Sequence, residues 1–184
     1  MGNLVRNIRS LLALLPVGGH IYSLPSYMLG LVLSVANSGD GPMAWLRGWP
    51  CPRVDVGDGD IWLGHVGIYP GVRLQCRGGG MIRVGDRSFI NHDTQLRSCT
   101  RLTIGSECMI SWNVLITDMR SVPAAGKEND AAFAPVSIGD NCWIGARALI
   151  LGGTVLGDGC VVAAGSIVQG DFGAGRIIAG KPAA

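Results

Sequence analysis

The stretch Ser137-Ile-Gly-Asp-Asn-Cys-Trp-Ile-Gly-Ala-Arg-Ala-Leu-Ile150 places an aliphatic residue at positions 138, 144 and 150. One face of a helix recurs every 3.6 residues and one face of a strand every two, so a period of six fits neither. The same phase continues through Leu156, Val162 and Val168. A fixed short repeat of this kind is typical of a solenoid, and hexapeptides indicate a parallel β-helix.

A second pattern accompanies the first, because a small or β-branched residue stands two positions before each aliphatic. These residues are Val136, Cys142, Ala148, Thr154, Cys160 and Ser166. Upstream, the period of six recurs in two further blocks, which are Val84, Ile90 and Leu96, then Ile104, Ile110 and Ile116. We expect each hexapeptide to form one side of a triangular prism, with the aliphatic inside and the small residue near a corner. The looser pattern from Val54 to Leu74 predicts an irregular first coil.

Composition limits the other possibilities. The 184 residues suffice for one domain, and we assign residues 54–184 to the hexapeptide-repeat domain. A net charge of +2 without runs of either sign argues against a nucleic-acid surface. The six cysteines include no C-x-x-C pair, and three of them occupy inward positions of the repeat. We interpret them as reduced core residues of a cytoplasmic protein.

The first 53 residues differ from the rest, and we expect an apolar, mainly helical segment there. Leu4, Ile8, Leu11 and Leu15 recur on one helical face, and Pro16 ends the pattern. No charged residue occurs from Leu11 to Gly39, yet prolines and glycines interrupt any run long enough to span a membrane. Three alternatives remain: a helical cap on the prism or on a neighbouring subunit, peripheral membrane contact, or a signal peptide.

A loop interrupts the repeat between Ile116 and Ile138, which lie 22 positions apart where one step would take six. We therefore place an inserted loop at 117–136. Long loops on rigid scaffolds often carry function, although an insertion without a role is also common.

Three blocks stand in order toward the C-terminal end: 137–146 (SIGDNCWIGA), 162–168 (VAAGSIV) and 178–183 (IAGKPA). Together they resemble the closing signature of the hexapeptide-repeat acyltransferase family, particularly its galactoside, maltose, nodulation and colanic acid O-acetyltransferases. The resemblance implies an all-β solenoid, specifically a left-handed parallel β-helix. It also implies a homotrimer in which acetyl-CoA, the acyl donor, lies between neighbouring prisms. The implied function is O-acetyl transfer to a sugar hydroxyl, in surface polysaccharide biosynthesis or on a lipid-linked precursor.

The same resemblance suggests which residues contact the coenzyme. Those expected along the pantetheine arm are Trp143, Gly145, Ala146, Ala164 and Gly165, and those expected near the nucleotide are Gln169 and Lys181. Each glycine taken alone is better explained as a corner residue of the prism, and only the set indicates a coenzyme site. The motif at 89–94 (FINHDT) resembles the family's acceptor-facing asparagine motif, which assigns this role to Asn91.

The catalytic base is not at its usual place. In the relatives a histidine follows the segment that corresponds to Ile116-Thr-Asp118, but positions 119–121 here read Met-Arg-Ser, and no histidine occurs from Asp93 to Ala184. His92 follows Asn91 directly, and an imidazole with a pKa near about 6.5 suits proton transfer at neutral pH. Asp118 is the second candidate, expected to be an exposed carboxylate and therefore a weak base.

Two alternative functions remain open at this point. A non-catalytic trimeric scaffold would keep the fold and lose turnover together with the loop histidine. A zinc enzyme on the same prism would need three converging histidines, but His20 lies outside the solenoid, so we expect no metal site. We expect a cytoplasmic enzyme, with membrane association through the N-terminal segment as an open alternative.

Overall fold

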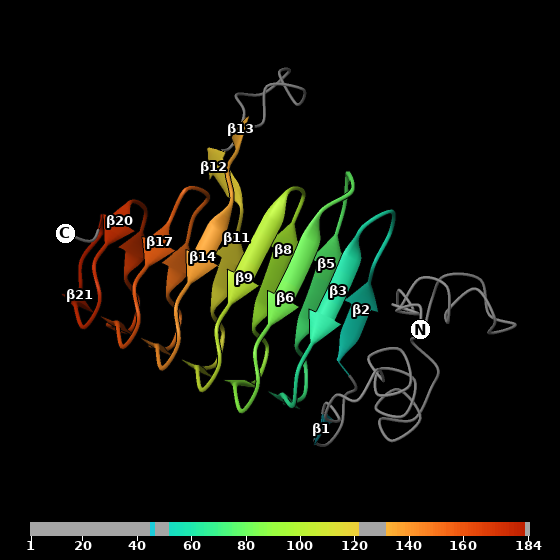
Figure 1. Ribbon diagram of the computed structural model, residues 1–184, viewed down its shortest axis with the longest axis horizontal. Helices are drawn as coiled ribbons and strands as arrows, with labels where there is room; N and C mark the ends of the chain where they lie inside the picture. The colour runs from blue at the N-terminus through green and yellow to red at the C-terminus, as the bar shows by residue number, and fades with distance from the viewer. Residues whose placement is uncertain (1–44, 47–51, 122–131, 183–184) are drawn as a thin grey trace, which may run out of the picture.

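The computed structural model describes residues 45–46, 52–121 and 132–182. Within these ranges the chain forms a parallel β-solenoid whose coils follow one another along the long axis of the molecule (Figure 1). Three sheets make the sides of the prism, and two of them contain six strands each, which corresponds to six coils. The predicted parallel β-helix is therefore confirmed.

Sheet A begins upstream of the other two sheets. Its strands are β1 (Trp45–Leu46), β4 (Gly67–Ile68), β7 (Phe89–Ile90), β10 (Met109–Ile110), β15 (Trp143–Ile144), β18 (Val161–Val162) and β21 (Ile177–Ile178). Sheet B contains β2 (Arg53–Asp55), β5 (Arg73–Cys76), β8 (Gln95–Ser98), β11 (Leu115–Thr117), β16 (Leu149–Ile150) and β19 (Ile167–Val168). Sheet C contains β3 (Asp60–Leu63), β6 (Met81–Val84), β9 (Arg101–Ile104), β14 (Val136–Ile138), β17 (Val155–Leu156) and β20 (Asp171–Phe172). We call the lines of turns where the sheets meet the A–B, B–C and C–A edges.

The core follows from the six-residue period. Register places each inward aliphatic directly on its counterpart in the next coil, as in Ile90, Ile110 and Ile144 of sheet A. These side chains are fully buried, and so are the small residues Cys142, Ala148 and Thr154 between them. Aliphatic rows therefore stack on themselves along the prism and bury apolar surface without large aromatic rings.

Polar side chains inside the prism are hydrogen-bonded across coils. The Thr94 hydroxyl donates to the carbonyl of Ser111 at 2.7 Å and accepts the N–H of Val114 at 3.1 Å. The Ser88 hydroxyl donates in the same way to Gly105 and accepts from Cys108. Burying these hydroxyls therefore costs little free energy, because each one both donates and accepts a hydrogen bond.

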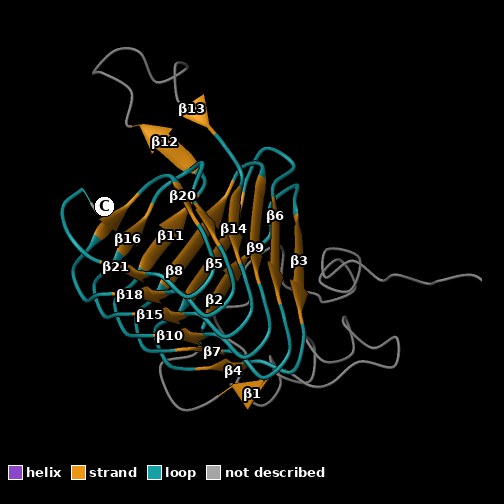
Figure 2. Ribbon diagram, turned by 60° about the vertical axis from the view of Figure 1, so that its left-hand side comes forward, coloured by secondary structure: helices purple, strands orange, loops and turns teal. Residues whose placement is uncertain are grey.

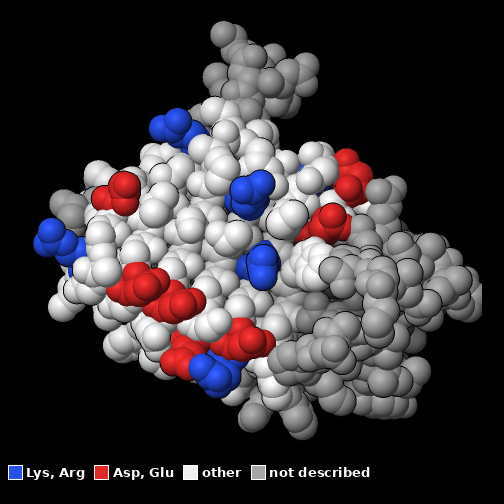
Figure 3. Space-filling model, in the orientation of Figure 1, with Lys and Arg blue, Asp and Glu red and all other residues white. Residues whose placement is uncertain are grey.

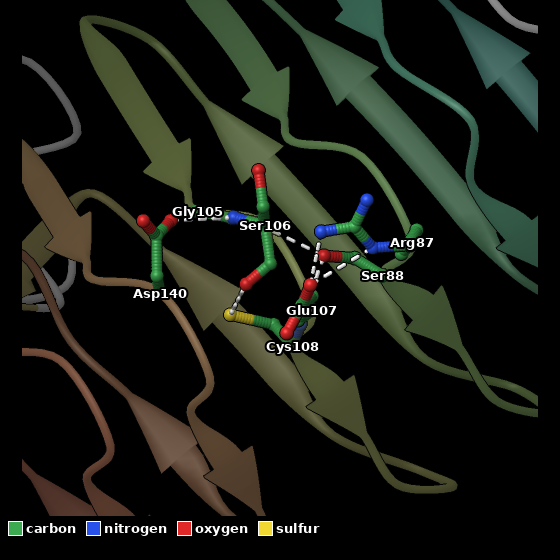
Figure 4. Close-up of polar contacts among 7 residues, drawn as sticks. All are labelled: Arg87, Ser88, Gly105, Ser106, Glu107, Cys108 and Asp140. Carbon is green, nitrogen blue, oxygen red and sulfur yellow. Dashed lines mark hydrogen bonds and ion pairs between the residues drawn. The ribbon is translucent and has the colours of Figure 1, made fainter.

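The C–A edge carries a ladder of carboxylates. Asp140 accepts the backbone N–H of Ser106 in the preceding coil at 2.7 Å (Figure 4). Asp158 accepts the backbone N–H of Asp140 at 2.8 Å. Gly105 is required for this contact, since a Cβ there would lie 2.3 Å from the Asp140 carboxylate. Acidic side chains gather along the lower edge of the face in Figure 3, where the strands of sheet C end.

An antiparallel hairpin interrupts the fourth coil between sheets B and C. It consists of β12 (Met119–Ser121) and β13 (Ala132–Phe133), and it stands away from the prism (Figure 2). The Ala134 N–H donates to the Asp118 carbonyl at 2.8 Å, which closes its base. This is the place where the sequence predicts an inserted loop at 117–136.

The predicted N-terminal helices fall on residues that lie outside the described ranges. One strand of that region is described, because β1 pairs in parallel with β4, with Trp45 opposite Gly67. Pairing with the solenoid thus begins before the predicted boundary at residue 54. Within the described ranges, no helix has the length and apolar character needed to cross a membrane.

Candidate functional site

The A–B edge collects most of the residues that the sequence assigns to the site. Successive turns are joined by backbone hydrogen bonds, from Asn113 to the His92 carbonyl, from Arg147 to that of Trp112, and from Gly165 to that of Ala146. His92, Trp112, Ala146 and Ala164 therefore form one column. Of the ten predicted site residues, seven lie in turns along this edge: Asn91, His92, Gly145, Ala146, Ala164, Gly165 and Lys181.

Ala146, Ala164 and Gly165 form a surface of small residues above the buried Gly145, and we call these four residues the small-residue strip. Gly145 has no space for a side chain, because a Cβ there would lie 2.6 Å from the Ala164 backbone nitrogen. Trp143 and Trp112 border the strip and are about half exposed, at 49% and 51%. The strip thus offers a smooth path with aromatic walls, which suits an extended, thin ligand.

Asn91 and His92 lie at the early end of this edge. The backbone N–H of His92 donates to the Asn91 side-chain carbonyl at 2.8 Å, which fixes the orientation of the Asn91 amide. The His92 ring is exposed and packs against Tyr69, with ring centroids 5.3 Å apart. His92 is therefore a positioned and accessible imidazole, as a general base needs to be.

Asp118 differs from the expectation, because its side chain is buried and not exposed. The carboxylate is only 1% accessible and accepts hydrogen bonds from the Thr100 N–H at 2.6 Å and the Cys99 N–H at 2.8 Å. The hydroxyls of Ser98 and Thr100 donate to the same oxygen. This carboxylate holds the turn of the preceding coil, and its lone pairs are already engaged. The correction makes His92 the stronger of the two candidate bases.

Gln169 lies on the other side of sheet B from the strip, at the B–C edge. Its amide donates to the Gly152 carbonyl at 3.0 Å and to the Arg120 carbonyl at 3.4 Å, so it connects the hairpin to the last coil. Lys181 lies at the A–B edge, where its ammonium approaches Gly165. A single chain therefore does not bring Gln169 and Lys181 together.

A groove of about 610 Å³ lies on the outer face of sheet B, beneath the hairpin. Its floor includes Leu115, Leu149 and Ile167, which are aligned in register on neighbouring strands. Met119 and Arg120, at the place where relatives carry the histidine, lie in its wall. The sequence analysis did not identify this groove. The sequence feature that indicates the groove is a second aliphatic residue, which directly precedes each inward aliphatic of sheet B in the last three coils.

The groove also contains a cysteine. Burial, followed by the neighbouring Asp118 carboxylate, raises the pKa of the Cys99 thiol. Cys99 therefore remains a thiol at neutral pH, which disfavours it as a nucleophile.

Comparison with known proteins connects this geometry to a family. Residues 135–169 match the model described as the hexapeptide repeat of succinyl-transferase. The chain is 32% identical over 126 residues to the Escherichia coli K12 protein named "Putative lipopolysaccharide biosynthesis O-acetyl transferase WbbJ", covering 61% of this chain and 63% of that protein. It spans between 50% and 63% of the length of the first curated relatives that it matches.

Two solved structures share the fold. A maltose O-acetyltransferase from Clostridium difficile 630 superposes with a TM-score of 0.56 at 27% identity, covering 70% of this chain and 68% of that one. A galactoside acetyltransferase in complex with coenzyme A superposes with a TM-score of 0.59 at 23% identity, covering 89% and 72%.

These matches show that the chain is similar to hexapeptide-repeat proteins over residues 135–169. More particularly, its relatives within that group are acetyltransferases, and the family resemblance predicted from the three C-terminal blocks is confirmed.

Proposed function

We propose that the protein is an acetyl-CoA-dependent O-acetyltransferase that acts on a saccharide hydroxyl. The observation that carries the proposal is the A–B edge, where an exposed imidazole and the small-residue strip share one column of turns. The names of the relatives support it, since WbbJ is described as an O-acetyl transferase of lipopolysaccharide biosynthesis. A role in surface polysaccharide biosynthesis is part of the proposal.

The small-residue strip fits the arm of the coenzyme. Acetyl-CoA supplies an activated acetyl thioester at the end of a thin pantetheine chain. Ala146, Ala164 and Gly165 carry little or no side chain, so such a chain can approach the backbone closely, and Trp143 gives it an apolar wall. Lys181 places a positive charge beside Gly165 at the far end of the strip, where it can attract the phosphates of the nucleotide.

His92 performs the proton transfer in this proposal. Its imidazole accepts the proton of the acceptor hydroxyl while that oxygen forms a bond to the acetyl carbon and the carbon–sulfur bond breaks. His92 then returns the proton to the departing sulfur. Asn91 orients the acceptor, because its side-chain carbonyl is held by the His92 N–H while its two amide N–H bonds make no hydrogen bond to the described residues.

A homotrimer would complete the site, since the strip and the groove lie on different edges of sheet B. In the assembly that we propose, the strip of one copy faces the groove of its neighbour. The outer face of sheet A has the apolar character of a subunit contact, because Met109, Trp143 and Ile177 are 42%, 49% and 78% exposed.

A non-catalytic scaffold is the second candidate, and one observation favours it. Met119 and Arg120 line the groove where relatives carry the base, and neither side chain can accept a proton at neutral pH. This alternative predicts a trimer that transfers no acetyl group.

The test combines binding, mass and turnover on the full chain. We expect calorimetry to show acetyl-CoA binding, light scattering to show a trimer, and mass spectrometry to show an acetylated saccharide. Absence of binding at millimolar acetyl-CoA would overturn the enzyme proposal. Binding and trimer formation without transfer to any saccharide in a panel would favour the scaffold.

A further inference from the structure

The imidazole of His92 is exposed, and its own polar atoms do not fix its direction. Within the described ranges, the ring of His92 forms no hydrogen bond and no ion pair. An exposed side chain of this kind changes rotamer within nanoseconds. A general base has to meet the acceptor hydroxyl in one geometry, so another contact must hold the ring if it is to work efficiently.

The ring of Tyr69 lies against this imidazole. Tyr69 directly follows β4, in the turn of the A–B edge that precedes the His92 turn. The two ring centroids are 5.3 Å apart, and the ring planes are inclined by 60°. Tilted arrangements at this separation are favourable for a pair of aromatic rings. The contact therefore favours one orientation of the imidazole over the others.

Backbone hydrogen bonds connect the two turns on both sides of this contact. The Tyr69 N–H donates to the Ile90 carbonyl at 3.0 Å, and the Asp93 N–H donates to the Pro70 carbonyl at 3.1 Å. The stacked coils thus fix the distance between the backbones of Tyr69 and His92. The relative position of the two rings then depends on their side-chain torsions alone.

A second aromatic residue supports Tyr69. The Phe89 ring lies 6.4 Å from the Tyr69 ring, at an angle of 57°. The residue opposite Phe89 in β4 is Gly67, so no outward side chain of β4 lies between Phe89 and Tyr69. Tyr69 is also partly buried, whereas His92 is exposed. Tyr69 is therefore the more constrained ring of the pair and can act as a fixed support for the imidazole.

We infer that Tyr69 is a positioning residue for the proton transfer, because its ring holds the His92 imidazole in one orientation. The inference rests on the proposed function, in which His92 is the base. Tyr69 stands in the irregular first coil, outside the motifs that predicted the site residues. It acts through His92 and needs no contact of its own with the acceptor or the coenzyme.

The first experiment measures kcat and KM of the full chain with a saccharide that it acetylates. Tyr69→Ala should lower kcat by about 3- to 10-fold, which corresponds to the interaction of one aromatic pair, and leave KM for acetyl-CoA unchanged. Tyr69→Phe keeps the ring and should restore kcat. The matched control is Trp62→Ala, which removes an exposed aromatic ring from β3 in sheet C and should change neither constant.

A double-mutant cycle separates positioning from a general structural effect. A residue that acts only through His92 has no further effect once the imidazole is absent. In the His92→Ala background, Tyr69→Ala should therefore leave the remaining rate unchanged within about twofold. A purely structural role of Tyr69 would instead lower the rate by the same factor in both backgrounds.

Nuclear magnetic resonance of the full chain with labelled histidine observes the ring without turnover. The His92 signal is assigned by its loss in His92→Ala, and the nearby Tyr69 ring should shift it from the position of an unconstrained histidine. Tyr69→Ala should remove this shift, Tyr69→Phe should keep it, and Trp62→Ala should leave it unchanged.

The positioning inference and the enzyme proposal fail separately. An unchanged kcat in Tyr69→Ala, no recovery in Tyr69→Phe, or equal losses in the two His92 backgrounds would overturn the inference and leave the enzyme proposal standing. Absence of transfer to every saccharide would count against the enzyme proposal. In that case the His92 signal decides the inference: a shift that disappears in Tyr69→Ala would support it, and a signal that stays the same would overturn it.

Discussion

The C–A edge and sheet B use similar residues for different purposes. On the C–A edge each turn repeats, and carboxylates such as Asp140 and Asp158 accept a backbone N–H from the neighbouring coil. Two exposed charges also pair there, Arg87 with Glu107 (Figure 4). Around sheet B the turns differ from coil to coil, a hairpin leaves the prism, and Arg97 and Arg120 form no ion pair with the described residues.

The difference shows how a repeat protein can separate structure from function. At a position that recurs in every coil, the side chain is already used for contacts between neighbouring coils. It therefore has no free hydrogen-bonding group to offer a ligand. A turn that departs from the repeat is free of that constraint. We therefore expect substitutions on the C–A edge to alter stability alone and those around sheet B to alter binding or catalysis.

The largest effect that we expect comes from His92→Ala. Loss of a general base slows such a step by about 10²- to 10⁴-fold, so kcat should fall within that range while acetyl-CoA affinity and trimer mass stay the same. His65→Ala is the matched control, because His65 is an exposed histidine on the C–A edge. The His65→Ala variant should have a kcat within about threefold of that of the unsubstituted protein, which we count as a minor effect. Equal effects of the two substitutions would remove His92 from the mechanism.

Asp118→Ala tests a buried carboxylate beside sheet B that has a structural role. It leaves donors from Ser98, Cys99 and Thr100 without their acceptor, and we expect a loss of about 3 kcal/mol in the free energy of unfolding. Asp140→Ala removes one exposed hydrogen bond and should cost about 1 kcal/mol. Urea denaturation measures both values. A smaller loss for Asp118→Ala than for Asp140→Ala would contradict the assigned role.

Gly145→Ala and Gly157→Ala form a pair with similar crowding. The added Cβ would lie 2.6 Å and 2.5 Å from a backbone nitrogen, so each should destabilise the fold by about 1–3 kcal/mol. Only the first displaces the Ala164 backbone of the small-residue strip, so it alone should weaken acetyl-CoA binding, by about 10-fold if the displacement costs about 1.4 kcal/mol of binding free energy. Calorimetry on the two variants checks this. An equal loss of affinity in both would indicate a general effect of stability.

The last prediction concerns the buried interior of the prism and applies only at alkaline pH. Burial raises the pKa of the Cys76 thiol from 9.0 to about 12. Between these values the unfolded chain loses the proton and the folded chain keeps it, so stability that is complete below pH 9 declines as the pH rises toward 12. The contribution is at most about 1.4 kcal/mol per pH unit. Cys76→Ala should flatten this decline in urea denaturation, and an unchanged slope would refute the assignment.

The six-residue period predicted the prism well, because it encodes contacts between equivalent positions of neighbouring coils. It identified the inward rows, and the family resemblance placed most of the site residues on what proved to be one edge. The buried state of Asp118 was not predictable in this way. Its partners Ser98 to Thr100 lie 18 to 20 residues earlier, in a turn that occurs once. The groove could not be predicted either, because its wall is formed by the hairpin. In the six-residue pattern the hairpin is visible only as an interruption, which does not say where its residues lie.

The backbone column of the A–B edge fixes distances in whole steps. His92 lies in the second turn and Lys181 in the sixth, so four strand spacings, about 19 Å, separate the two ends of the proposed site. Each coil contributes one step of about 4.8 Å, and no smaller adjustment is available to a rigid stack. The number of coils therefore sets the length of the site. Duplicating the 18 residues 144–161 would insert one coil and lengthen the site by one step, which should favour a donor with a longer arm.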